Sequence, residues 1–242
     1  MIRQQLISDL ATLGPWLNSL SSTETPQSEI FSPELTDAFK AVISREIYRN
    51  GWFEPHEVKQ SLKGLSTWLN HETLNAFSSP YAYHEFRPSL GLILAGNLPM
   101  VGFHDILCGL LSGYKLQIKL SSDDQQLIPL IVRGLSELNP LYADLIQINP
   151  QKLSGFNAVI GTGSDSTLLH FQSYFKNIPH LLRGNRTSIA ILSGTETPQE
   201  LHALGYDIFQ YFGRGCRNVT HLIVPEGYSF DAFFEAILPF QT

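Results

Sequence analysis

Cysteine is scarce in this sequence, with two residues among 242. Cys108 stands inside the apolar run 106–111, whereas Cys216 stands among glycines and arginines. Such different surroundings argue against a disulfide between them, as expected for a reducing cytoplasm. Spacings typical of metal ligands are missing too, because the eight histidines form no H-x-x-x-H or H-E-x-x-H pair. The sequence therefore suggests no metal site.

A basic excess and a long hydrophobic run are also missing. The net charge of −6 argues against a general nucleic-acid binder. The longest apolar stretch, 100–111, is interrupted by His104 and Asp105 and is too short to span a bilayer. The first ten residues lack the continuous apolar core of a secretion signal. We therefore expect a soluble, cytoplasmic protein that neither inserts into membranes nor binds nucleic acid.

Hydrophobic residues are plentiful, at 43% of the 242 residues. A chain of this length and composition can form one or two domains with a sizeable core. The first part of the chain has apolar residues at helical spacing. Ser32 followed by Pro33 is typical of a helix N-cap. The stretch 21–28 is a polar connector without periodicity. We expect residues 1–84 to form a helical N-terminal segment.

From about residue 89 short apolar strands alternate with helical patterns. Strands are expected at 90–95, 115–120, 145–148 and 156–161, and helices at 101–112, 124–138 and 165–175. This alternation indicates an α/β protein with a parallel sheet covered on both faces. Ligands of such sheets bind at the carboxyl ends of the strands.

The alternation restarts after residues 184–186, which are the best candidate for a boundary. Beyond it, strands are expected at 187–192 and 219–224, and helices at 198–212 and 230–238. The last expected loop before a strand contains Cys216, between Arg214 and Arg217. The two arginines would lower the pKa of its thiol, and the flanking glycines would let backbone N–H groups approach a reacting group. We therefore interpret Cys216 as a nucleophile, and Cys108 as a small core residue.

Three further positions are candidates for binding or catalysis. Asn97 follows a buried strand, where its amide could donate to an oxyanion or simply form a turn. Lys119 ends the next strand, where it could reach a ribose or phosphate or extend along the surface. The turn 161–164 precedes a helix and suits a phosphate. Its spacing is not G-x-G-x-x-G, so a purely structural turn is an equal alternative.

Taken in order, these motifs resemble the aldehyde dehydrogenase superfamily, and specifically its acyl-CoA reductase (LuxC-like) branch. That superfamily has an Asn-x-Pro turn, a Lys closing the next strand, a Gly-Ser turn, a Gly-Gly-Lys turn and then the nucleophilic cysteine. The corresponding residues here are Asn97-Leu98-Pro99, Lys119, Gly163-Ser164, Gly184-Asn185-Arg186 and Gly215-Cys216. The resemblance covers roughly residues 85–235.

The resemblance implies an aldehyde-dehydrogenase-like fold. Residues 85–185 would form a Rossmann-like dinucleotide-binding domain, and 186–242 a partial catalytic domain carrying the cysteine loop. Family members continue well past that loop, so we expect this chain to hold only the first part of the catalytic domain.

The resemblance also implies an activity, the NADPH-dependent reduction of a long-chain fatty acyl-CoA to its aldehyde through a Cys216 thioester. Asn97 and the backbone N–H of Cys216 would stabilise the oxyanion. The cofactor-binding residues would be Lys119, Gly163, Ser164 and Gly184. Nothing in the sequence itself selects NADPH over NADH. A homo-oligomer is a further expectation.

Two departures from the family pattern are informative. Leu182 stands where hydrolytic aldehyde dehydrogenases carry a glutamate that activates water. An apolar residue there favours acyl transfer involving coenzyme A over aldehyde oxidation. Asn185 and Arg186 replace the Gly-Lys pair and leave cofactor contacts there open. The alternatives are a truncated, non-catalytic nucleotide- or acyl-CoA-binding paralogue or fragment, and an ordinary aldehyde dehydrogenase.

Overall fold

A computed structural model describes residues 2–22, 30–149 and 152–241. The chain divides into two compact units, Met1–Arg183 and Gly184–Thr242. Most of the polar connector expected at 21–28 lies outside the described residues.

The first unit begins with the predicted helices. They are α1 (Arg3–Ser21), α2 (Pro33–Arg45), α3 (Pro55–Trp68) and α4 (His71–Ser78), with a 3-10 turn at Glu46–Tyr48. The cap predicted at Ser32 is confirmed, because its hydroxyl oxygen accepts the Leu35 backbone N–H at 3.2 Å, with Pro33 at the first helical position. In the described ranges no helix has both the length and the apolar character needed to cross a membrane.

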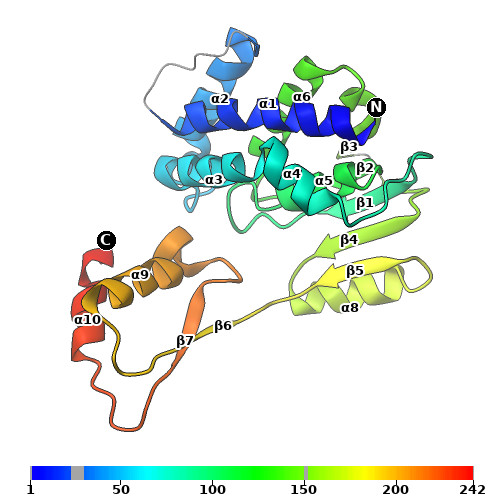
Figure 1. Cartoon of the computed structure of the whole chain (residues 1–242). Coiled ribbons are helices and arrows are strands. Elements are labelled where there is room, and N and C mark those ends of the chain that lie inside the picture. Colours follow the sequence, from blue (N-terminus) through cyan, green and yellow to red (C-terminus); the bar gives the residue numbers. More distant parts are fainter. Residues whose placement is uncertain (1, 23–29, 150–151, 242) are drawn as a thin grey trace. The chain divides into compact units, whose positions relative to one another are not determined.

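A five-stranded parallel sheet follows, with strand order β3-β2-β1-β4-β5. Its elements in chain order are β1 (Ser89–Ile93), α5 (Phe103–Leu111), β2 (Lys115–Lys119), α6 (Leu127–Leu138), α7 (Tyr142–Leu145), β3 (Ile146–Ile148), β4 (Ala158–Thr162), α8 (Asp165–Tyr174) and β5 (His180–Arg183). The chain builds outward from β1 to β3, then restarts beside β1 with β4. In Figure 1, α8 lies beside β4 and β5, away from α5 and α6. The predicted fold class, an α/β protein with a parallel sheet, is confirmed.

Two elements of this unit were not predicted. The strand β5 is four residues long and pairs only with β4, and its first two residues, His180 and Leu181, are exposed. A short edge strand shows neither the alternation nor the continuous apolar run by which strands are recognised. The helix α7 is a single turn of four residues. In addition, α6 begins at Leu127 rather than at residue 124.

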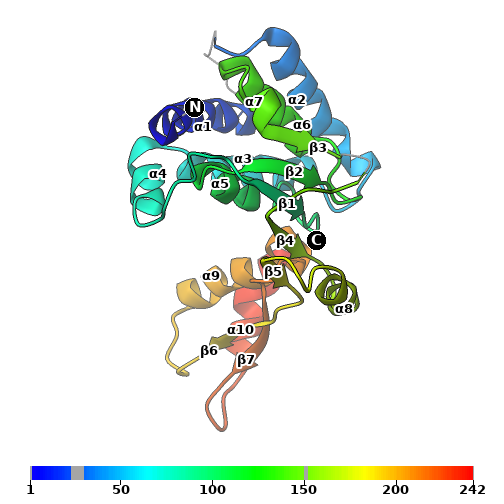
Figure 2. The same cartoon turned by 90° about the vertical axis from the view of Figure 1, so that its right-hand side faces the viewer.

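The helices and the sheet of the first unit share one hydrophobic core. Trp16 of α1 is 1% exposed, with its ring centroid 4.3 Å from that of Phe31 and 5.5 Å from that of Phe39. The same core includes Leu92 of β1 and Ile118 of β2, both fully buried. Figure 2 shows α1 and α2 beside α6 and α7. The N-terminal helices are therefore packed on the sheet domain and support its strands.

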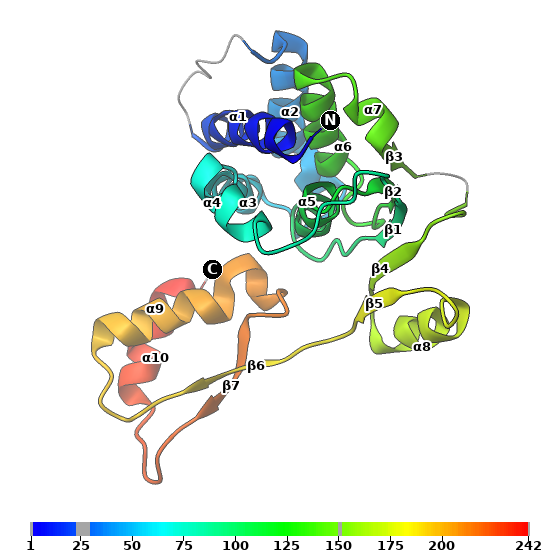
Figure 3. The ribbon, with the colours of Figure 1, turned by 45° about the vertical axis from the view of Figure 1, so that its right-hand side comes forward.

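The second unit has two parallel strands, β6 (Ser188–Ile191) and β7 (Val219–Ile223). Its helices are α9 (Pro198–Phe209) and α10 (Asp231–Ile237), with 3-10 turns at Gln210–Gly213 and Leu238–Phe240. Figure 3 shows α9 and α10 next to each other. A small core contains Leu192, Leu201 and Phe233.

The helix α9 begins as a capping box but ends earlier than predicted. The Thr197 hydroxyl oxygen accepts the Glu200 N–H, and the Glu200 carboxylate accepts the Thr197 N–H. The prediction that this helix extends to Phe212 was wrong. Tyr211 and Phe212 have φ of 53° and 56°, in the left-handed region, and so leave the helix after Phe209. Non-glycine residues adopt this region at an energetic cost.

Candidate functional site

The polar side chains predicted after β1, β2 and β4 arise at one edge of the sheet. Ile93, the last residue of β1, pairs with Lys119 on one side and with Gly161 on the other. The turn containing Asn97 therefore leaves the sheet between Lys119 and the turn 161–164. This is the carboxyl edge at the point where the chain reverses its direction of growth, which is the usual ligand-binding position in such sheets.

The turn containing Asn97 is anchored from two sides. Asn97 itself is half-buried. On one side the Ser61 hydroxyl of α3 donates to the Pro99 carbonyl at 2.6 Å. On the other side the Met100 N–H donates to the Asp124 carboxylate oxygen Oδ2 at 2.8 Å. Met100 has a φ of 57°, so the turn contains a left-handed residue whose N–H is held by a buried carboxylate.

Asp124 was predicted only as the start of a helix, and its role in this turn was missed. Its side chain is 3% exposed. Its second oxygen, Oδ1, has no hydrogen-bond partner in the described part of the chain. Burial raises the pKa of Asp124 to about 6, while the Met100 N–H opposes the shift and the Glu46 carboxylate adds to it. Burial of this carboxyl therefore makes its ionised form unfavourable, although the carboxyl holds the N–H of the left-handed residue Met100.

Polar groups of the turn after β4 are hydrogen-bonded within the protein. Ser164 is the N-cap of α8, and its hydroxyl oxygen accepts the Thr167 N–H at 3.3 Å. The Gly163 N–H donates to the Arg183 carbonyl at 3.1 Å. These bonds are those of a structural strand-to-helix turn. Ser164 remains exposed at the start of a ten-residue helix, so a cofactor phosphate could approach there, although Asp165 in the first turn would oppose a negative charge.

Lys119 is the clearest cation at this edge. Its side chain is exposed at the last position of β2, where β1 and β3 flank the strand. Lys115, at the first position of the same strand, is also exposed but lies at the opposite edge of the sheet. The carboxyl edge thus offers a positive charge beside the Asn97 turn, which fits the phosphates or ribose of a nucleotide.

Three titratable groups join α5 to β5 close to this edge. Arg183 Nη1 lies 2.6 Å from Asp105 Oδ1, and His104 Nδ1 lies 3.7 Å from the same oxygen. Burial acts to raise the pKa of Asp105, but the neighbouring His104 and the hydrogen bond from Arg183 outweigh it and hold that pKa below its usual value. The neighbouring Asp105 carboxylate raises the pKa of His104 to about 9. These contacts tie α5 to the edge strand β5.

The prediction that Cys108 is a core residue was wrong. Its side chain is half-buried, and its sulfur lies 3.7 Å from His104 Nδ1, one helical turn away. The imidazole in turn contacts the exposed rings of Trp68 and Phe77 edge-on. Residues 104 and 108 therefore occupy the less buried face of α5, which the apolar composition of the segment does not reveal.

Leu182, the position of interest for water activation, packs against apolar groups. It pairs with Gly161 across β4 and β5. A methyl carbon of Leu182 and the ring of Phe171 both lie within 3.2 Å of the space that a side chain at Gly161 would occupy. The side chain thus fills the region between β5 and α8.

The second unit contains the remaining predicted residues, Gly184 and Cys216. Gly184 is its first residue and is half-buried. Cys216 is exposed in the turn between the 3-10 segment and β7, and its thiol is free, as is that of Cys108. The Cys216 carbonyl accepts the Ser188 hydroxyl at 3.3 Å, which ties the turn to β6.

Asn218, two residues beyond the cysteine, was not predicted to matter. Its side chain is 9% exposed. Its Oδ1 accepts the Gly215 N–H at 2.7 Å, and its Nδ2 donates to backbone carbonyls at the end of α9. The sequence holds one signal, an asparagine directly before a β-branched strand, where asparagine is depleted.

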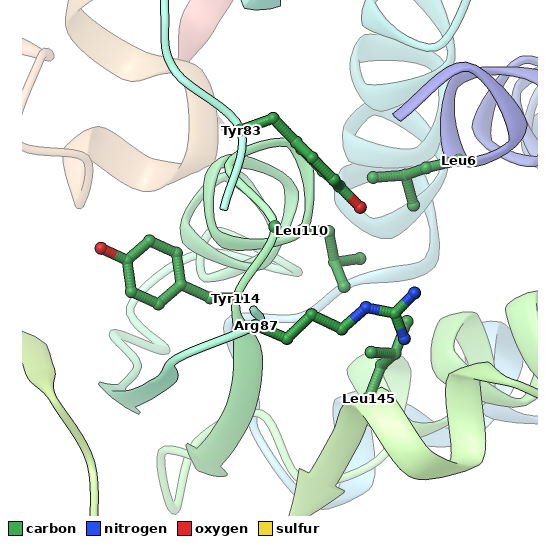
Figure 4. A pocket seen from close by; sticks show the side chains of 7 residues that line it. Leu6, Tyr83, Arg87, Leu110, Tyr114 and Leu145 are labelled. Atoms are coloured by element: carbon green, nitrogen blue, oxygen red, sulfur yellow. The ribbon is translucent and has the colours of Figure 1, made fainter. Parts of the chain in front are cut away.

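A small pocket lies in the first unit, at the amino edge of its sheet (Figure 4). Its lining comes from the helices α1, α5 and α7 and from the loops that precede β1 and β2. The lining residues are Leu6, Tyr83, Arg87, Leu110, Gly113, Tyr114 and Leu145. Figure 4 shows the Arg87 guanidinium extending toward Leu145. Because Asn97, Lys119, Gly163 and Ser164 lie at or beyond the carboxyl ends of their strands, this pocket is separate from that edge of the sheet.

Comparisons with known proteins identify the fold. No family model matches the sequence, and no curated protein matches it. Solved structures do match. Aldehyde dehydrogenase 21 from Physcomitrella patens has a TM-score of 0.65 at 12% identity, over 99% of this chain and 56% of that chain. An NAD-dependent benzaldehyde dehydrogenase from Corynebacterium glutamicum has a TM-score of 0.58 at 13% identity, over 95% and 53%.

An indole-3-acetaldehyde dehydrogenase from P. syringae has a TM-score of 0.59 at 12% identity, over 99% of this chain and 50% of that chain. The chain therefore has the fold of the corresponding part of aldehyde dehydrogenases and spans about half the length of these structures. At such identities the likeness establishes the fold, and the resemblance to acyl-CoA reductases remains a prediction from the motifs.

Proposed function

We propose that this chain belongs to an oxidoreductase that reduces a long-chain fatty acyl-CoA to the aldehyde, through a thioester on Cys216. The observation that carries the proposal is the exposed Cys216 thiol in a glycine-flanked turn between arginines, within a chain that has the aldehyde dehydrogenase fold. A structural cysteine is usually buried and unreactive, whereas a nucleophile has to be accessible.

In the proposed reaction the Cys216 thiolate attacks the carbonyl carbon of the acyl-CoA. The new carbon–sulfur bond forms as the bond to coenzyme A breaks, and coenzyme A leaves as a thiolate that takes a proton from solvent. The order of the motifs leads us to propose that the Asn97 side chain and the Cys216 N–H donate hydrogen bonds to the oxyanion of the tetrahedral intermediate. The assignment of Asn97 is open to a substitution test.

A reduced nicotinamide cofactor would supply the hydride that converts the thioester to a hemithioacetal, from which the aldehyde leaves and the Cys216 thiolate is restored. The carboxyl edge of the sheet is the part of the chain suited to hold it. Lys119 provides an exposed positive charge, and Gly163 and Ser164 lie at the start of α8. We propose NADPH as the cofactor and Gly184 as a further contact, and NADH is the alternative.

Leu182 supports reduction over hydrolysis. An apolar side chain packed near Phe171 cannot take a proton from water, so a thioester on Cys216 would persist until a thiol or a hydride reaches it. Coenzyme A needs no such base, because a thiolate leaves readily.

The proposal is tested with radiolabelled palmitoyl-CoA. The wild-type chain is expected to retain label after denaturation in detergent, and Cys216→Ser to retain none. Cys108→Ser is the matched control and should be labelled as well as wild type. Equal labelling of Cys216→Ser would assign the acyl group to another residue and overturn the proposal. No label on a folded wild-type chain would favour a non-catalytic nucleotide- or acyl-CoA-binding protein.

Aldehyde oxidation is the second candidate, because the matched solved structures include dehydrogenases of benzaldehyde and indole-3-acetaldehyde. The two candidates differ in their product. Release of free acid from an aldehyde and NAD⁺ without coenzyme A would favour oxidation and would show that Leu182 does not prevent hydrolysis.

A further inference from the structure

The buried side chain of Asn218 connects the turn that carries Cys216 to the end of α9. Asn218 Oδ1 accepts the Gly215 N–H at 2.7 Å, immediately before the cysteine. Asn218 Nδ2 donates to the carbonyls of Asp207 and Gln210, both at 3.0 Å, and contacts that of Ile208 at 3.3 Å. The Asn218 backbone N–H also donates to the Gly215 carbonyl at 3.0 Å.

The segment that these bonds span is strained. Tyr211, Phe212 and Gly213 have consecutive positive φ angles of 53°, 56° and 67°. Two of these three residues carry a Cβ, which disfavours this conformation, so the surrounding structure has to hold it. The Asn218 side chain bonds to Gln210 before the strained run and to Gly215 after it. It therefore closes the loop whose last member is the residue preceding Cys216.

The chemistry of an amide side chain suits this task. Asparagine has one acceptor oxygen and two donor hydrogens. Here the oxygen accepts the Gly215 N–H, while the nitrogen donates to carbonyls at the end of α9. Aspartate could keep the bond to Gly215 but would face those carbonyls with a negative charge. Alanine would lose both sets of bonds.

Resting on the proposed function, we infer that Asn218 is a positioning residue for Cys216. It holds the cysteine turn against the end of α9, so that the nucleophile has one fixed place relative to the backbone around it. A displacement of about 1 Å at a nucleophile can cost about a hundredfold in rate. Asn218 touches no reacting group and acts through the Gly215 N–H.

The experiment compares Asn218→Ala with Thr197→Ala. Thr197 caps the opposite end of α9, so its loss weakens the same helix without touching the cysteine turn. With radiolabelled palmitoyl-CoA, acyl transfer to Cys216 should fall at least tenfold in Asn218→Ala and stay within twofold in Thr197→Ala. Iodoacetamide alkylation of the exposed Cys216 should stay within about threefold in both. A fall in Thr197→Ala equal to that in Asn218→Ala, or unchanged transfer in Asn218→Ala, would overturn the inference.

Hydrogen exchange separates this inference from the proposed function. Exchange of the Gly215 amide should accelerate at least tenfold in Asn218→Ala and stay unchanged in Thr197→Ala. If wild type takes no acyl group but this acceleration is found, the proposed function fails while the positioning of the turn stands. Unchanged Gly215 exchange overturns the positioning itself.

Asn218→Asp carries the test if the alanine variant does not fold. Because its carboxylate can still accept the Gly215 N–H, it is expected to keep Gly215 exchange within about threefold of wild type and to transfer the acyl group within about tenfold of the wild-type rate. Gly215 exchange accelerated tenfold or more in folded Asn218→Asp would overturn the inference. If neither variant folds under conditions in which Thr197→Ala is folded, the side chain is needed for the fold alone and the inference is wrong.

Discussion

Arg183 Nη1 lies 2.6 Å from Asp105 Oδ1, and this ion pair joins the last residue of the edge strand β5 to the first turn of α5. The two side chains are 28% and 6% exposed. Because β5 pairs only with β4, it has one neighbouring strand to hold it. The ion pair supplies a second attachment, to the helix that follows the central strand β1.

Removing the cation should destabilise the first unit. Arg183→Met leaves Asp105 buried with His104 as its remaining charged neighbour, and we expect a loss of about 1–3 kcal/mol in the free energy of unfolding at pH 7. The pKa of folded Asp105 is lowered, so the contribution is present above about pH 4 and is lost as the pH falls further. The free energy of unfolding is measured by urea titration monitored by tryptophan fluorescence, since all three tryptophans lie in the first unit.

The double variant Asp105→Asn with Arg183→Met is the control for that experiment. It leaves no uncompensated charge and should lose less than the sum of the two single variants. A single Arg183→Met variant as stable as wild type would mean that the ion pair contributes nothing to the attachment of β5.

The carboxyl of Asp124 should reduce stability at neutral pH. Burial raises its folded pKa to about 6, above an unfolded value of about 3.9. The cost of ionisation is therefore complete above pH 6, declines as the pH falls, and is absent below about pH 4. Asp124→Asn should raise the free energy of unfolding by about 1–3 kcal/mol at pH 7 and converge with wild type near pH 4. The neighbouring Asp123 is exposed, so Asp123→Asn should change stability by less than about 0.5 kcal/mol. A destabilised Asp124→Asn at pH 7 would contradict this account.

Gly96 should not tolerate a side chain. A Cβ there would lie 2.5 Å from Ser121 Cβ, so Gly96→Ala should destabilise by about 1–3 kcal/mol and displace the adjacent Asn97. Gly64 is exposed inside α3 and has nothing within 4 Å of such a Cβ, so Gly64→Ala should stabilise by about 0.5–1 kcal/mol. Thermal melting of both variants shows whether each substitution lowers or raises the melting temperature. A change in the same direction for both variants would contradict the close contact between Gly96 and Ser121.

Lys119 and Lys115 should differ in their effect on nucleotide binding. Both are exposed, at opposite ends of β2. If the carboxyl edge holds the cofactor, Lys119→Ala should raise the Kd for NADPH about tenfold, or roughly 1.4 kcal/mol. Lys115→Ala should change it by less than twofold. Titration calorimetry at two salt concentrations measures both, and equal weakening would place the cofactor elsewhere.

Much of the fold was predictable because its signals are local. The cap at Ser32 depends on residues three positions apart, the strand β1 is largely a continuous apolar run, and β2 alternates between apolar and polar residues. β5 was missed because an exposed edge strand needs no apolar run. Cys108 was assigned to the core because the run 106–111 around it is apolar, and the exposed His104, one turn earlier on the same face of α5, was not weighed.

The candidate site was predictable in part. The motif order located the turns after β1, β2 and β4, and strand pairing brings those turns to one edge. The supporting residues were not predictable. Asp124 accepts a hydrogen bond from a turn 24 residues earlier in the chain, and Asn218 donates to a carbonyl 11 residues away. Such bonds leave no spacing pattern in the sequence.

The sequence by itself determined the alternation of strands and helices, the position of Cys216 beside glycines, and the apolar residue at 182, because each is a property of neighbouring residues. Tertiary structure alone decided that Arg183 pairs with Asp105, that Asp124 is buried as an acid, and that Asn218 closes the cysteine turn. These contacts depend on which segments meet after folding, and burial and hydrogen-bond geometry exist only once they have met.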